Sequence, residues 1–285
     1  MEITWAIVSC IIFAVFGYLI GSIPNAVIIG KIHHVDITKV GSGNPGGTNV
    51  WREFGWKWGV GCMILDFMKG FIPSLIVLLL TSFIPQFRDG TISQMSFMGY
   101  DHLNLYTILT GAMAMTGHAF PIFFHFKGGK NVMVTCGFIG ATCPLMMGIA
   151  LAMFVTFELI SHKISVGSLA AAATVFLYSL VCLIISLAIP SLNENYMIGG
   201  WYFTDKIYFL TDWIYGLVLV LEALFVVFRH KSNIKKLAKH EENNFDPKSQ
   251  EYDQKSNKRK IITKIKNLPL GRSFYFFFFF LLIPA

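Results

Sequence analysis

The chain has 285 residues, of which 54% are hydrophobic and 14% are charged, and its formal net charge at pH 7 is +7. Its apolar residues come in runs that are far too long for a soluble core, so the composition predicts an all-α polytopic membrane protein. All five cysteines lie within these runs without CxxC spacing, which argues against a disulfide framework and against a metal site. Nucleic-acid recognition is not expected, because the basic tail at residues 235–266 lacks interleaved aromatic residues apart from Phe245 and Tyr252.

Six apolar runs are candidates for membrane-spanning helices, and they cover residues 3–29, 59–84, 103–124, 132–159, 166–189 and 207–228. The first run is too long for the h-region of a signal peptide and follows Glu2 rather than a basic segment, so we expect it to remain as a spanning helix. The fourth run is either one tilted helix or two short helices that meet at Cys143-Pro144, where proline cannot donate a helical hydrogen bond.

The distribution of basic residues favours two helices in the fourth run. The loop after the first run carries four lysine or arginine residues, whereas the loop after the second run carries only Arg88. The tail from Arg229 onward holds thirteen lysine or arginine residues against five acidic ones. The positive-inside rule then places both the first loop and the tail in the cytoplasm. We predict seven transmembrane helices, with the N-terminus outside and the C-terminus cytoplasmic. Residues 1–234 would form the transmembrane domain and 235–285 a lysine-rich tail with a short apolar end.

A glycine-rich stretch at residues 40–52, VGSGNPGGTNVWR, follows the first run. Glycine lets several backbone N–H groups converge on one anion, and hydroxyl, amide and guanidinium groups add further donors. The stretch is therefore a candidate phosphate-binding loop, although a plain turn between two helices has the same composition. Its polar members are Ser42, Asn44, Thr48, Asn49 and Arg52.

A second cluster, Lys127-Gly128-Gly129-Lys130, precedes a helix expected to begin near Val132. Two glycines beside two lysines at a helix N-terminus would make a second anion site, and the alternative is an ordinary basic flank.

Two further clusters are expected at the same membrane face. Ser165 and Ser168 open the next helix, where capping alone explains them. His230 and Asn233 are three residues apart after the last run, so on a continuing helix they would share a face, and the histidine could accept a proton. The alternative is a basic flank with an incidental histidine. Within the second run, Asp66 and Lys69 are expected to pair.

Three segments in this order resemble the signature motifs of the bacterial membrane glycerol-3-phosphate acyltransferases that use acyl phosphate, the PlsY family. They are GSGNPGGTNVWR, GHAFPIFFHFKGGKNV and RHKSNIKKL. The resemblance covers residues 21–237 and also includes the segments GSIP, DFMKG and ISVGS. The chain departs from the family pattern after the Gly-Gly-Lys of the second motif, where Asn131, Met133 and Val134 replace the usual small residues and threonine. It also departs at Pro45, Gly47 and Lys236. The family is seven-helical, with its motifs facing the cytoplasm.

The resemblance implies roles for individual residues. Catalytic roles fall on Ser42, Arg52, Lys127 and His230. Substrate-binding roles fall on Gly43, Asn44, Thr48, Asn49, Gly128, Gly129, Lys130, Ser165, Ser168 and Asn233.

The implied reaction is transfer of an acyl chain from acyl phosphate to the 1-position of sn-glycerol 3-phosphate, which gives lysophosphatidic acid and phosphate for phospholipid biosynthesis. The expected location is the bacterial plasma membrane, with the active site on the cytoplasmic face. Besides its two substrates and membrane lipid, the chain is expected to contact the enzyme that makes acyl phosphate, and no cofactor is expected. The alternative is a membrane transporter of a phosphorylated solute, although no second half of the chain resembles the first, as inverted repeats would require.

Overall fold

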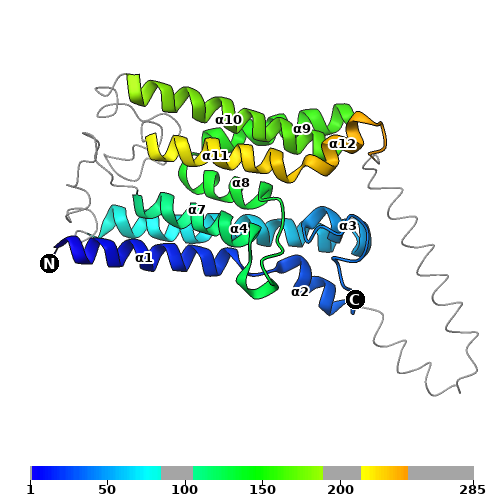
Figure 1. Ribbon diagram of the computed structural model, residues 1–285, viewed down its shortest axis with the longest axis horizontal. Coiled ribbons are helices and arrows are strands. Elements are labelled where there is room, and N and C mark those ends of the chain that lie inside the picture. Colours follow the sequence, from blue (N-terminus) through cyan, green and yellow to red (C-terminus); the bar gives the residue numbers. More distant parts are fainter. Residues whose placement is uncertain (1, 85–104, 189–212, 243–285) are drawn as a thin grey trace, which may run out of the picture.

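The computed structural model describes residues 2–84, 105–188 and 213–242, and these residues form helices and connecting loops without strands (Figure 1). The helices are α1 (Glu2–Gly21), α2 (Asn25–Ile32), α3 (Gly47–Phe54), α4 (Trp56–Phe83), α7 (Leu105–Ala119), the 3₁₀ turn η1 (Ile122–Phe124), α8 (Val132–Thr142), α9 (Pro144–Ser161), α10 (Ile164–Ala188), α11 (Trp213–Arg229) and α12 (Lys231–Ala238). The glycine-rich stretch is therefore only partly a loop, because its second half forms α3.

Close backbone contacts hold α1 against α7 and α8 against α4. A Cβ added to Gly17 would lie 2.2 Å from the carbonyl oxygen of Thr110, and one added to Gly137 would lie 2.0 Å from that of Phe67. Only glycine allows two helices to approach so closely, which is a common packing device in membranes. Phe138 on α8 is fully buried and belongs to the largest core cluster.

The fourth apolar run is divided as predicted. Helix α8 ends at Thr142 and α9 begins at Pro144, so proline occupies the first helical position, where its missing N–H costs nothing. The chain also reverses there (Figure 1): α8 runs antiparallel to α11, with Thr142 bonded to Tyr215 and Thr135 to Glu222, and α9 packs against α10.

Among the described residues, five helical segments are long and apolar enough to cross a membrane, and the count rises to six if α11 and α12, bent by 53°, form one span. Helix α8, with 11 residues, is shorter than a spanning helix needs to be. Seven crossings and their orientation therefore remain predictions, and most of the predicted tail lies outside the described residues.

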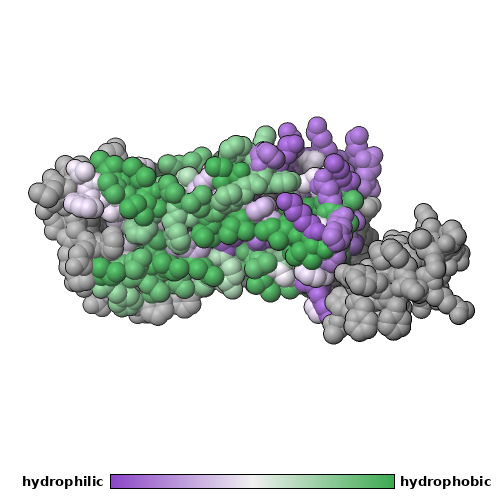
Figure 2. Space-filling view, turned by 90° about the horizontal axis from the view of Figure 1, so that it is seen from below, coloured by the Kyte–Doolittle hydropathy of each residue, from purple (hydrophilic) through white to green (hydrophobic). Residues whose placement is uncertain are grey.

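Charged and polar residues gather at one end of the bundle, while the sides are apolar (Figure 2). That end holds α2, α3, the loop before α8, the turn between α9 and α10, and α12 (Figure 1). The alternating helix directions thus bring every predicted motif to one face.

Candidate active site

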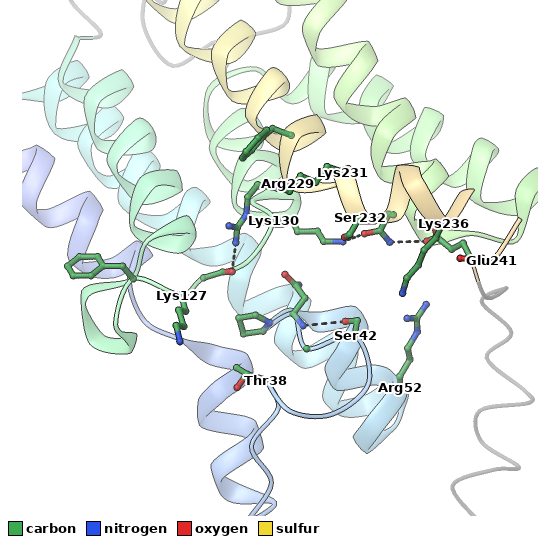
Figure 3. Close-up of a pocket in the computed structure, with 18 residues that line it drawn as sticks. Thr38, Ser42, Arg52, Lys127, Lys130, Arg229, Lys231, Ser232, Lys236 and Glu241 are labelled. Atoms are coloured by element: carbon green, nitrogen blue, oxygen red, sulfur yellow. Dashed lines mark hydrogen bonds between the residues drawn. The ribbon is translucent and has the colours of Figure 1, made fainter. Parts of the chain in front are cut away.

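Two adjoining cavities open at the polar end, with volumes of about 670 Å³ and about 140 Å³. Every predicted site residue lines at least one of them except Gly129, which lines a small neighbouring pocket. Six basic and two acidic side chains line the larger cavity. They are Arg52, Lys127, Lys130, Arg229, Lys231 and Lys236, and Glu241 and Glu242. Figure 3 shows Arg52 of α3 and Lys236 of α12 extended toward one another across it. A cavity of this charge favours an anionic ligand.

The opening loop, which is the part of the glycine-rich stretch that precedes α3 (residues 40–46), is held by the side chain of Asn49 at the start of that helix. Asn49 is 1% exposed; its Oδ1 accepts a bond from the N–H of Ser42 at 2.9 Å, and its Nδ2 donates to the carbonyls of Ile37 and Val40 at 3.0 and 3.1 Å. These bonds make Asn49 a support of the loop, rather than leaving its amide free for a substrate.

Glycine allows the backbone of the opening loop to turn. Gly43 has a φ of +69°, a left-handed conformation that glycine adopts without steric cost. The hydroxyl of Ser42 accepts a long hydrogen bond from the N–H of Asn44 at 3.4 Å. Thr48 and the half-buried Arg52 lie one turn apart on α3, so both line the smaller cavity.

The second loop, residues 128–131 before α8, packs against the end of α7 at its two glycines. A Cβ on Gly128 would lie 1.9 Å from the carbonyl oxygen of His118, and one on Gly129 would lie 2.2 Å from the His118 ring. The guanidinium of Arg229, on α11, donates to the carbonyl of Gly128 at 2.6 Å (Figure 3). It also donates to the carbonyl of Gly129 at 2.9 Å. The paired glycines are thus required for packing, whatever they contribute to anion binding.

Lys130 lies between the two cavities and lines both. Its ammonium donates to Oδ1 of Asn233, whose amide donates in turn to Glu242 at 3.0 Å. Burial is the main cause that lowers the pKa of Lys130 to about 8, and the nearby Arg52 and Arg229 lower it further, while Glu242 opposes them. Lys127, by contrast, is exposed at the rim of the larger cavity.

His230 occupies the break between α11 and α12, so it does not share a continuous helix with Asn233 as predicted. The residue is 3% exposed, and Nδ1 of its ring lies 2.8 Å from the carbonyl oxygen of Val226. A carbonyl can only accept, so Nδ1 carries the hydrogen, and Nε2 of the neutral ring is left as a proton acceptor. His230 lines the smaller cavity.

The two predicted serines of α10 also line the smaller cavity, and they differ in their bonding. Ser168 donates to the carbonyl of Ile164 at 2.9 Å, within the helix. The hydroxyl of Ser165 is buried and has no hydrogen-bond partner among the described residues.

Asp66 and Lys69 form the predicted ion pair, at 2.9 Å, with both side chains 5% exposed. Asn25 donates to Asp66 at 3.0 Å, and Nδ1 of His118 lies 3.5 Å from the Lys69 ammonium. This buried network joins α2, α4 and α7 directly beneath the second loop.

Sequence reasoning did not select Arg229, Glu222 or Glu242 for the site. Arg229 stood in the third motif but resembled a basic flank. Glu222 was the stronger missed signal, because an acidic residue within an apolar run is costly and usually functional.

Fold and site together define a helical membrane protein with cavities lined by basic residues at one end. The family model described as glycerol-3-phosphate acyltransferase matches residues 11–240, and the chain belongs to that family. Glycerol-3-phosphate acyltransferases of Listeria monocytogenes and Aquifex aeolicus are 34% and 31% identical, over 82% and 83% of this chain and 96% and 100% of theirs.

Two crystal structures of PlsY (YgiH), an integral membrane glycerol 3-phosphate acyltransferase, are similar in fold. The glycerol 3-phosphate form has a TM-score of 0.60 at 28% identity and covers 84% of this chain and 96% of its own. The lysophosphatidic acid form has a TM-score of 0.59 at 27% identity, with coverage of 86% and 99%.

Proposed function

We propose that the chain transfers an acyl group from acyl phosphate to the 1-hydroxyl of sn-glycerol 3-phosphate, releasing lysophosphatidic acid and inorganic phosphate. One observation carries this proposal: two cavities meet at shared residues, among them Ser42, Arg52 and Lys130. Two substrates that each carry a phosphate could therefore lie side by side. Family membership and the relatives' names support the acceptor, and the donor is our further proposal.

In the proposed step, the 1-hydroxyl oxygen attacks the acyl carbonyl carbon and a C–O ester bond forms. The bond between that carbon and the phosphate oxygen breaks, and phosphate leaves with the electron pair. Acyl phosphate is already activated, so orientation and charge stabilisation suffice without a covalent nucleophile. Arg52, Lys127 and Lys130 would stabilise the departing phosphate, with the backbone amides of the two loops.

The hydroxyl proton needs an acceptor, and we assign this role to Nε2 of His230, because His230 lines the smaller cavity and its Nδ1 carries the hydrogen. His230→Ala tests it against the alternative, proton transfer to the acceptor's own phosphate. A loss of kcat beyond about a hundredfold, together with loss of the acidic limb of the pH profile, would identify a general base. A modest loss with an unchanged profile would leave His230 as a positioning group.

We also propose that the polar end faces the cytoplasm of a bacterial plasma membrane, because its excess of lysine and arginine fits the positive-inside rule. Single cysteines at 162 and 199, in a cysteine-free background, should be labelled from the cytoplasmic and the external side respectively. The reverse pattern would contradict this orientation and the seven crossings.

The decisive experiment supplies radiolabelled glycerol 3-phosphate and acyl phosphate to the purified protein in liposomes. Label recovered in lysophosphatidate means acyl transfer, whereas label trapped unmodified inside the liposomes means transport. Acyl-CoA and acyl carrier protein, supplied without acyl phosphate, should give no turnover. Comparable rates with acyl-CoA would overturn the donor assignment.

A further inference from the structure

Glu222 is the acidic residue of the otherwise apolar helix α11, seven residues before Arg229. Its Oε1 accepts hydrogen bonds from Nδ2 of Asn131 at 2.8 Å and from the hydroxyl of Thr135 at 3.1 Å. Both partners belong to the start of α8, directly after Lys130. A carboxylate in a spanning helix is unfavourable unless it is paired or has a function. Here it is hydrogen-bonded to the beginning of α8.

Asn131 is a position that needs such support. It is 1% exposed, and its φ of +69° puts it in the left-handed region, which asparagine tolerates but which remains uncommon outside glycine. It precedes the first residue of α8 without a capping bond from its own side chain. A backbone conformation of this kind persists where surrounding contacts over-determine it.

We infer that Glu222 is a positioning residue, which fixes the amide of Asn131 and the start of α8 and thereby places the adjacent Lys130. Arg229 holds Gly128 and Gly129 from the same face of α11, since seven residues make two helical turns. Helix α11 therefore holds the loop on both sides of Lys130. The inference rests on the proposed function only for the role given to Lys130.

The geometry assigns the effect of Glu222 to hydrogen bonding rather than to its charge. The acid whose charge acts on Lys130 is Glu242, on the other side of the site. A glutamine at 222 offers an oxygen that can accept the same two bonds. Glu222→Gln should therefore keep kcat/KM within about threefold, whereas Glu222→Ala should lower it by about tenfold, as expected for loss of hydrogen bonds that position a charged group.

A matched control is available on the same two helices. Tyr215 on α11 and Thr142 on α8 share a buried hydrogen bond of 2.8 Å at the opposite end of α8. Tyr215→Phe removes one contact between the same helices without touching the loop. Its kcat/KM should stay near that of the unmodified protein, even if its melting temperature falls.

The test combines a double-mutant cycle with limited proteolysis. If Glu222 acts through Lys130, Glu222→Ala should cost little further kcat/KM in a Lys130→Ala background. Trypsin should also cleave after Lys130 faster in Glu222→Ala than in the unmodified protein, and Tyr215→Phe should show no such increase.

Three results would overturn the inference. One is a double variant whose loss of kcat/KM equals the product of the losses of Glu222→Ala and Lys130→Ala. The others are a Glu222→Gln variant as impaired as Glu222→Ala, and a rate of tryptic cleavage after Lys130 that is unchanged in Glu222→Ala. If the unmodified protein fails to use acyl phosphate, the proposed function fails. The proteolysis comparison would still decide whether Glu222 positions the loop.

Discussion

The two glycine-rich loops at the polar end are held in different ways. The opening loop is fastened from within, because Asn49 bonds to backbone groups seven, nine and twelve residues away. The loop at 128–131 is fastened from α11, about a hundred residues further along the chain, by Arg229 and Glu222. A locally fastened loop keeps its shape wherever its own sequence is intact, whereas the second loop depends on how α11 packs.

The largest effect is expected from Arg52→Lys, which tests whether the opening loop and α3 bind an anion at all. Lysine keeps the charge but cannot make the planar two-point contact of a guanidinium. We expect kcat/KM to fall by about tenfold to a thousandfold. Lys235→Ala, on the exposed surface of α12, is the control and should cost little. Unchanged activity in Arg52→Lys would make the opening loop a structural turn.

Arg229→Gln should have the next largest effect, because it releases the second loop from α11. The guanidinium makes three hydrogen bonds to two carbonyls, and bonds from a charged donor contribute roughly 1.5–3 kcal/mol each. Loss of loop position should lower kcat/KM by about tenfold to a hundredfold. Lys231→Gln, two residues away and exposed at the rim of the larger cavity, is the matched control for charge. Equal losses in both variants would mean that the cavity needs charge rather than a fixed loop.

This difference between the loops also separates what the sequence could predict from what it could not. Proline at 144 marks a helix start by its own chemistry, so the break in the fourth run was predictable, as was the pairing of Asp66 with Lys69 three residues later. The motifs and the predicted topology also indicated that the candidate site residues lie at one face of the membrane. The contacts of Arg229 and Glu222 were not predictable, because they depend on which helices become neighbours. The role of Asn49 depends on carbonyl directions in a folded turn, which a motif does not specify.

A smaller effect is expected from pH, and it distinguishes Lys130 from Arg52. The pKa of Lys130 is lowered to about 8, chiefly by burial, so its charge is present below that pH and is lost as the pH rises through it. The KM for the phosphate substrate bound by Lys130 should therefore rise above about pH 8, by up to roughly tenfold per pH unit. In Lys130→Ala this rise should disappear, and in a Lys127→Ala control it should remain. A KM that stays constant to pH 9.5 in the unmodified protein would contradict the assignment.

The smallest effect concerns Glu242, which accepts a bond from Asn233 and lines both cavities. Because this carboxylate lines both cavities, we expect it to compete with a substrate phosphate for the same donors. Glu242→Gln keeps the size of the side chain and removes the charge, and it should lower the KM for glycerol 3-phosphate by about twofold to fivefold, an amount typical of a partly solvated charge pair. Glu241→Gln, which changes the neighbouring charge without an Asn233 contact in the described structure, is the control. If Glu242 competes with phosphate for Lys130 of the second loop, the change in KM caused by Glu242→Gln should vanish in a Lys130→Ala background. A raised KM in Glu242→Gln would show instead that this acid holds Asn233 in its binding position.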